Sequence, residues 1–150
     1  MRGQRLIQKF TEEELTELFT ALESKQERPT AESFEKWISR WEGFVREVEE
    51  LPGYRHLTYE FFNDISIREI LFESLQILRP QLRSKAEAVL QPLDERFLKA
   101  TQRVEKAPFW DGIDPSRWWN FCLPKRLSPE AREEWESYFQ GSNYVFEGAK

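Results

Sequence analysis

The sequence contains very few of the side chains that bind metals or act as nucleophiles. His56 is the one histidine and Cys122 the one cysteine. Because zinc sites draw most of their ligands from these two residue types, we expect no bound metal. A single cysteine also cannot form a disulfide within the chain. A Cys122–His56 nucleophile pair is the alternative, although a cysteine between two apolar neighbours is better explained as a small packed group.

Motifs for cofactors and catalysis are missing as well. The six glycines are not grouped as in a phosphate-binding loop, and no G-x-S-x-G sequence is present. Asp111 and Asp114 carry oxygen donors, but their spacing does not match an EF-hand loop, and helix capping explains Asp114 better. We therefore expect no cofactor and no catalytic activity. A small enzyme with a carboxylate-based site in a helical bundle is the alternative.

Long apolar runs and clusters of basic residues are also absent. No run approaches the roughly 18 residues needed to cross a bilayer, and "MRGQRLIQKF" lacks the apolar region of a signal peptide. The formal net charge is −5, and residues 11–51 alone carry −7. Binding to nucleic acid needs clustered Lys and Arg. We therefore expect a cytoplasmic protein that binds neither membranes nor nucleic acids, and whose partner is a protein with a basic surface.

Helical patterning, by contrast, is abundant. A length of 150 residues suits one domain, and 39% hydrophobic with 33% charged residues suits a folded one. Apolar residues recur at spacings of three and four along most of the chain. The predicted fold is all-α: one domain over residues 1–150, with flexible ends at 1–10 and 142–150. It is an irregular bundle of five or six helices, with an aromatic-rich loop and a short helix before the C-terminal helix.

Capping residues predict the first two helices. Thr11 with Glu14 forms a capping box, and Thr30 caps a second helix that runs to about residue 51. Trp37 and Trp41 share one stripe of this helix with other apolar residues, and we expect both indoles to be buried. The other members of the stripe are Phe34, Ile38, Val45 and Val48.

The central helices are predicted from a capping box and a proline. Residues 53–65 are expected to form a loop with a short helix near 58–63, and Ser66 with Glu69 begins the next helix, which ends near residue 79. Pro80 then serves as the first residue of another helix. Its apolar stripe continues to residue 104 past Pro92, which predicts a kink, with a break into two helices as the alternative.

The last helices follow Asp-Pro and Ser-Pro pairs. Asp114 is predicted to cap one short turn that carries Trp118 and Trp119, and Ser128 to cap a final helix that ends at Gly141. The stretch "PFWDGIDPSRWWN" (108–120) places three indoles among helix breakers. We expect it to seal one end of the bundle, since exposing three indoles would favour aggregation.

Two sets of residues are candidates for contact with a partner. Successive helical residues are about 100° apart, so one of Trp118 and Trp119 is expected to be buried while the other, with Trp110 and Arg117, faces outward. The second set is a ridge of glutamates at seven-residue spacing beside the aromatic stripe, for which a solvated helix flank is the simpler interpretation. The ridge consists of Glu35, Glu42 and Glu49.

These observations favour a protein-binding domain without catalytic activity. An inhibitor or immunity-type protein that covers a basic surface of its target is one concrete form, by analogy of size and charge only. A homo-oligomer that buries an aromatic stripe against its own copy is another alternative.

Overall fold

The computed structural model describes residues 10–26 and 32–147, and helices dominate it. In chain order the elements are α2 (Glu12–Ser24), α3 (Phe34–Glu49), α4 (Thr58–Gln76), α5 (Pro80–Ala100), β1 (Thr101–Arg103), the 3₁₀ helix η1 (Trp118–Phe121), β2 (Cys122–Pro124) and α6 (Pro129–Tyr138). The predicted all-α bundle is confirmed, with five α-helices and a single two-stranded sheet among the described residues. None of the described helices has the length and apolarity to cross a membrane.

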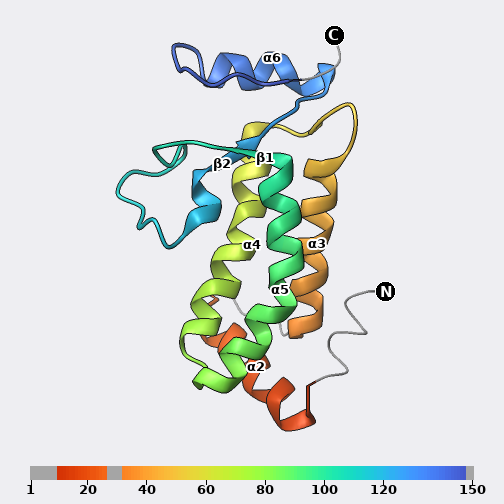
Figure 1. Cartoon of the computed structure of the whole chain (residues 1–150), viewed down its shortest axis with the longest axis vertical. Coiled ribbons are helices and arrows are strands. Elements are labelled where there is room, and N and C mark those ends of the chain that lie inside the picture. The colour runs from red at the N-terminus through yellow and green to blue at the C-terminus, as the bar shows by residue number, and fades with distance from the viewer. Residues whose placement is uncertain (1–9, 27–31, 148–150) are drawn as a thin grey trace.

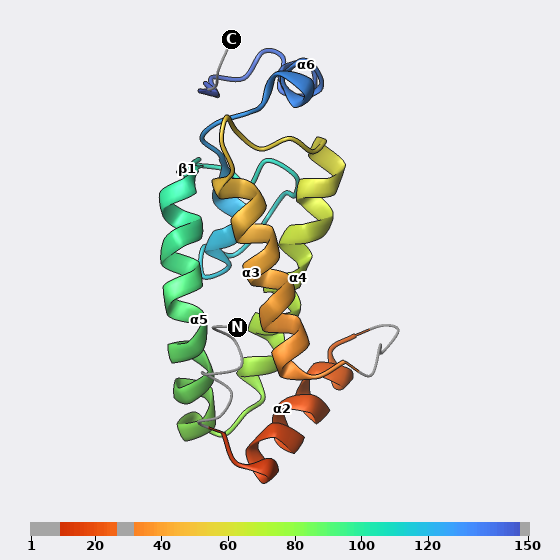
Figure 2. The same ribbon diagram turned by 90° about the vertical axis from the view of Figure 1, so that its right-hand side faces the viewer.

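Three long helices lie side by side along the long axis, and two shorter ones close the ends. Figures 1 and 2 show α3, α4 and α5 upright, α2 at one end and α6 across the other. The two strands pair antiparallel near the α6 end, with Gln102 opposite Leu123. The segment between β1 and η1 runs outward along the flank of the bundle beside α4 (Figure 1).

The caps of the first helices follow the sequence closely. Thr11 and Glu14 form the predicted capping box of α2. Thr30 lies outside the described residues, and the residue that caps α3 is Ser33, whose hydroxyl accepts the Lys36 N–H. The apolar stripe of α3 is buried as predicted, with Trp37 6% and Trp41 0% exposed.

The helix start predicted at Ser66 is wrong, because α4 is continuous from Thr58 to Gln76. The short helix predicted near 58–63 is the first part of α4. The buried apolar residues of α4 begin at Phe61 and recur at helical spacing through Ile65 and Leu71, so one apolar stripe spans the expected break. The Ser66 hydroxyl donates to the carbonyl of Asn63 inside this helix. Packing of the stripe thus outweighs the local capping preference of a serine.

The helix predicted to start at Pro80 does begin there, as α5, and it passes through Pro92 without a break. It does not continue to residue 104, however, but ends at Ala100. Thr101 turns into an extended conformation and its hydroxyl donates to the carbonyl of Phe97, 2.8 Å away. Residues 101–103 then pair with β2. The partner strand therefore ends the helix.

At the C-terminal end, α6 begins at Pro129 after Ser128 but stops at Tyr138, before the predicted end at Gly141. Gly141 adopts a φ of +87° in the turn that follows, a conformation that glycine accepts readily. The described part of the predicted flexible end, residues 142–147, lies against α6. There the Leu127 N–H donates to the Glu147 carbonyl at 2.7 Å, and Tyr144 and Phe146 pack on the core.

An ion pair joins three helices inside the aromatic core. The Arg68 guanidinium on α4 makes two hydrogen bonds to the Asp94 carboxylate on α5, at 3.1 and 3.0 Å. The Trp41 indole N–H on α3 donates to the same carboxylate at 3.0 Å. The guanidinium also lies over the rings of Trp118 and Trp119, 5.8 and 4.8 Å from their centroids, which are cation–π distances. This node fixes α3, α4, α5 and η1 relative to one another.

We predict that Asp94→Ala lowers the free energy of unfolding by about 3–5 kcal/mol, because it leaves the buried Arg68 without its counter-ion. The measurement is urea unfolding followed by far-UV circular dichroism. Glu95→Ala removes an exposed carboxylate from the next position of the same helix, and its effect should stay within about 0.5 kcal/mol. Equal effects of the two substitutions would contradict a structural role for the pair.

Candidate protein-binding surface

The stretch 108–120 divides between core and surface. Trp119 is completely buried, and its indole N–H donates to the Glu69 carboxylate at 3.2 Å. Trp118 is half-buried, whereas Trp110 is 53% exposed. Of the adjacent pair, therefore, Trp119 is the core residue and has no surface to offer a partner. Trp119 packs on Phe72 of α4 and Trp118 on Phe97 of α5. The stretch thus covers the flank of the bundle and not the predicted end, which α6 covers (Figure 1), and it leaves the Trp110 indole outside.

Arg117 is largely occupied within the molecule. Its guanidinium forms ion pairs with Glu69 and Glu73 on α4 and lies over the Phe72 ring, 5.1 Å from the centroid. Arg117 therefore fastens the end of the loop to α4, and less of its charge faces outward than the sequence suggests.

Asp114 organises the turn before η1 instead of capping the helix itself. Its carboxylate accepts the Ser116 backbone N–H at 2.8 Å, and its carbonyl accepts the Arg117 N–H at 3.0 Å. The first of these bonds lowers the pKa of Asp114. Arg117 occupies the N-cap position of η1, without a capping hydrogen bond from its side chain. Together with Gly112, whose φ is +71°, this turn returns the chain to the bundle after Trp110.

Five aromatic side chains from three segments meet at the α6 end and form what we call the aromatic surface. Trp110 lies 5.0 Å and Phe109 5.5 Å from the Phe62 ring of α4, and Phe109 lies 5.8 Å from Tyr138 of α6. Tyr59, one turn before Phe62, lines the same hollow as Tyr138. Tyr59, Trp110 and Tyr138 are more than half exposed.

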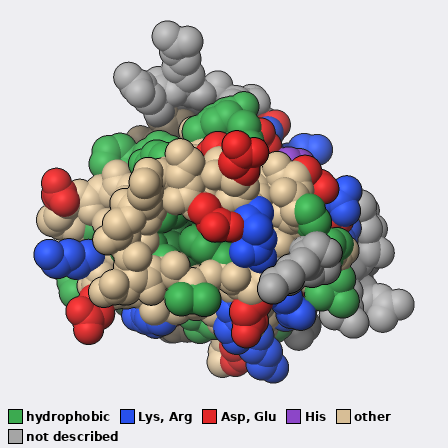
Figure 3. Space-filling model, turned by 90° about the horizontal axis from the view of Figure 1, so that it is seen from above, with side chains coloured by type: hydrophobic (Ala, Val, Ile, Leu, Met, Phe, Trp, Pro, Cys, Tyr) green, Lys and Arg blue, Asp and Glu red, His purple; other side chains and the backbone are tan. Residues whose placement is uncertain are grey.

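The aromatic surface is hollowed on both sides of Phe62. A pocket of about 380 Å³ opens between α4 and the loop, and its walls include Trp110, Ile113 and Arg117. A smaller one of about 160 Å³ lies between Tyr59, Phe109 and Tyr138. Seen from the α6 end, hydrophobic side chains reach the surface with acidic ones beside them (Figure 3). Such concave, apolar sites suit an anchoring side chain from a partner.

Charges near the aromatic surface are mainly negative. The helix α6, Pro129–Tyr138, carries four glutamates and one arginine. Asp111 and Asp114 in the loop are exposed. One of the glutamates, Glu134, has a structural role, since its carboxylate accepts the Thr58 backbone N–H at 2.6 Å and the Thr58 hydroxyl at 2.8 Å. It thereby caps the N-terminus of α4.

The glutamate ridge predicted on α3 is largely neutralised. Glu49 makes a two-point ion pair with Arg96 of α5, at 3.0 and 2.6 Å, and Glu42 pairs with Arg46 one turn along at 2.8 Å. Only Glu35 has no ion pair with a described residue. The ridge joins α3 to α5 more than it presents charge to a partner.

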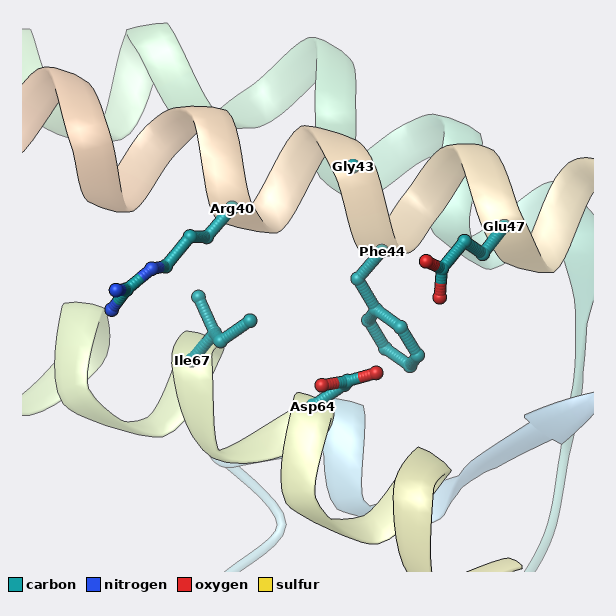
Figure 4. Close-up of a pocket in the computed structure, with 6 residues that line it drawn as sticks. All are labelled: Arg40, Gly43, Phe44, Glu47, Asp64 and Ile67. Atoms are coloured by element: carbon teal, nitrogen blue, oxygen red, sulfur yellow. The ribbon is translucent and has the colours of Figure 1, made fainter. Parts of the chain in front are cut away.

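A second group of acidic residues lies on the other flank of α4. A pocket of about 400 Å³ opens between α3 and α4, with Glu47 and Asp64 at one end and Arg40 at the other. Figure 4 shows the Glu47 and Asp64 carboxylates facing the same space beside the Phe44 ring. We call this the acidic pocket. His56 stands next to it, with Nε2 3.8 Å from Glu47 and Nδ1 3.1 Å from Glu60.

Asp64 is a carboxyl group without a partner. It makes no hydrogen bond or ion pair with any described residue, and burial raises its pKa to about 6, with Glu47 and Glu60 adding to the rise and His56 opposing it. A carboxylate in this setting destabilises the fold at neutral pH. Unpaired groups of this kind occur more often at functional sites than elsewhere.

The alternative Cys122–His56 nucleophile pair is not formed. Cys122 is buried and its Sγ lies 3.6 Å from the Trp118 carbonyl, while both His56 nitrogens face glutamates. Burial raises the pKa of Cys122 to about 11, so the thiol stays protonated at neutral pH. Among the described residues no group of three or more His, Cys, Asp or Glu side chains could hold a metal ion.

Comparison with protein-family models, with curated protein sequences and with solved structures finds no match for this chain. Its function is therefore inferred from its own surface chemistry. Sequence reasoning predicts only part of the aromatic surface. Trp110 was among the predicted residues, but Tyr59, Phe62 and Tyr138 were not, because their meeting depends on how α4 and α6 cross. The dense run "YEFF" at 59–62 was the available sign.

Two substitutions in the stretch 108–120 should separate its structural from its surface indoles. We predict that Trp119→Ala lowers the free energy of unfolding by about 3–5 kcal/mol, since it empties a fully buried site. Trp110→Ala should cost less than about 1 kcal/mol, because half of this side chain is already in water. Denaturant unfolding measures both. A larger loss of stability for Trp110→Ala than for Trp119→Ala would mean that the loop indole, and not the buried indole of η1, stabilises the fold.

The Asp64 carboxyl should make stability fall as the pH rises. Its pKa is about 6 in the folded protein against about 3.9 in the unfolded chain, so the folded state binds more protons between these values. Asp64→Asn should therefore raise the melting temperature at pH 7.5 by about 3 °C or more and leave it nearly unchanged at pH 4. Asp111→Asn, at an exposed position, is the control. A stabilisation equal at both pH values would contradict the raised pKa.

Proposed function

We propose that this domain binds another protein through the aromatic surface. The observation that carries the proposal is the exposure of three large aromatic side chains, Tyr59, Trp110 and Tyr138, beside two hollows at one end of the bundle. Aromatic residues give large contact area for little loss of side-chain freedom, and they dominate binding energy at protein interfaces. Exposed aromatic clusters on a folded domain are otherwise an aggregation hazard.

The surface is held in shape before any partner arrives. Arg117 fastens the loop to α4 through Glu69 and Glu73, and Glu134 ties α6 to the start of α4. A preformed surface loses little conformational entropy on binding. These ties support a partner that docks on a fixed shape.

The charges around the aromatic surface favour a partner with a basic rim. The elements that carry the aromatic surface also carry acidic residues, namely the glutamates of α6 and the exposed Asp111 and Asp114 of the loop, and a charged rim beside an apolar centre is the usual arrangement of a protein interface. An inhibitor or immunity-type protein remains one form of this proposal. Its acidic rim would speed association with a basic target and lose that effect as salt increases.

The proposal is tested by site-specific photocrosslinking in the cells that make the protein. A benzophenone amino acid replaces Trp110 or Tyr138 in two variants and Ile77 in a third. Ile77 follows α4 at the opposite end of the bundle and is 52% exposed, against 53% and 56% for the other two, so exposure is matched. We expect the first two variants to crosslink to one and the same protein, and the third not to.

The captured partner then allows a quantitative measurement. Tyr59→Ala and Trp110→Ala should each weaken binding by about tenfold or more, as expected for aromatic residues at the centre of an interface. Crosslinks that join two copies of this chain would replace the proposal by the homo-oligomer. Crosslinks that are as frequent from position 77 would contradict a binding role for the aromatic surface.

A further inference from the structure

We propose that the acidic pocket receives a lysine or arginine side chain of the protein partner. This inference rests on the proposed function, since it assigns a specific role to a site next to the aromatic surface. Glu47 from α3 and Asp64 from α4 line one end of a pocket of about 400 Å³, and Figure 4 shows both carboxylates turned toward its interior.

The carboxylates of this pocket are not neutralised within the described chain. Asp64 has no ion pair with a described residue. Glu47 and Glu60 share one basic neighbour, the imidazole of the partly exposed His56. Arg40, at the far end, is held by Glu32 at 2.6 Å and lies 5.1 Å from the Trp37 ring centroid. Its charge is thus directed elsewhere. This differs from the ridge on α3, where Glu42 and Glu49 have arginine partners.

A buried hydroxyl beside the carboxylates gives a second, independent indication. Tyr54 is 0% exposed, and its hydroxyl has no hydrogen-bond partner among the described residues. The Tyr54 ring lies 6.4 Å from that of Phe44, which lines the pocket, and 5.5 Å from that of His56, which contacts Glu47 and Glu60. Unpartnered buried polar atoms are rare in folded proteins. An ammonium or guanidinium group donates several hydrogen bonds, which a phenol oxygen and carboxylates accept.

The remaining walls suit the stem of a basic side chain. Phe44 and Ile67 provide apolar surface, and Gly43 has no side chain to obstruct the opening, with no other atom within 4 Å of where its Cβ would stand. Lysine and arginine carry a methylene stem that packs on apolar surface while the charge reaches a polar group. A small neutral ligand would leave the carboxylates unpaired.

The acidic pocket and the aromatic surface share the first half of α4. Asp64 and Ile67 line the pocket on the flank that faces α3, and Phe62 lies on the flank that faces the loop. Tyr59 lies on the exposed side of α4, between these two flanks. A partner that covers this side of α4 therefore reaches both sites, with an apolar side chain at the aromatic surface and a basic side chain in the acidic pocket.

The test uses amino acid derivatives, so that it does not depend on having found the partner. Nα-acetyl-lysine methylamide and Nα-acetyl-arginine methylamide are titrated into the protein and followed by NMR, at the Gly43 amide and the Asp64 carboxyl carbon. Nα-acetyl-norleucine methylamide, an uncharged analogue of lysine, is the control ligand. We expect saturable shifts with the two cations and none with the neutral compound.

Variants of the protein sharpen the result. Glu47→Gln and Asp64→Asn should each weaken the binding of the cations by about fivefold or more, because each removes one charge of the receptor. Glu35→Gln, on the same helix but outside the pocket, should leave it unchanged. Circular dichroism verifies that the variants are folded.

Three results would overturn the inference: no shifts with either cation, equal shifts with norleucine, or unchanged affinity in both pocket variants. Much tighter binding of spermidine than of the lysine derivative would also overturn it, because it would assign the pocket to a free polyamine. Crosslinking through the aromatic surface is a separate measurement, so failure of the pocket and failure of the proposed function are distinguishable.

Discussion

The structure depends on one buried ion pair, between Arg68 and Asp94. Burying a guanidinium and a carboxylate is costly unless the pair is well formed and its remaining polar atoms are bonded. Here two hydrogen bonds join the pair, and the Trp41 indole adds a third to the carboxylate, while the Arg68 Nη1 atom has no hydrogen-bond partner among the described residues. Because the guanidinium also lies under the Trp118 and Trp119 rings, the position of η1 is linked to that of the three long helices. The loop that carries Trp110 leaves and rejoins the bundle at points set by this arrangement.

The sequence correctly predicted those features of the fold that depend on interactions between residues close together in the chain. The capping box of Thr11, the start of α5 at Pro80 and the buried stripe of Trp37 and Trp41 depend on residues within one or two turns, and all are confirmed. The sequence predicts a helix near residues 58–63, but the group that caps α4 could not be predicted in this way. That group is the carboxylate of Glu134, 76 positions further along the chain, and no pattern near Thr58 reveals it.

The same limit applies to the candidate site. Spacing placed Glu35, Glu42 and Glu49 on one ridge, but whether such charges face a partner depends on what lies across from them. Arg96, on another helix, neutralises Glu49, whereas nothing described does so for Asp64. The carboxylates of the acidic pocket are ordinary in the sequence and become distinctive only through the absence of a counter-ion. The exposure of a tryptophan is likewise set by the fold and not by the residue type. Trp119 is buried and Trp110 is exposed because of the turn between them.

The aromatic surface is assembled from α4, the loop before η1 and α6. Phe62 and Trp110, whose rings are in contact, are 48 positions apart in the sequence, and Phe109 and Tyr138 are 29 positions apart. No single stretch of the chain contains it. A peptide copied from one segment would carry a fragment of the surface without its shape, so the proposed binding site is a conformational epitope and not a linear motif. Recognition is consequently coupled to folding: a partner that binds only the assembled surface also holds the domain in its native state, by an amount that grows with the partner's free concentration.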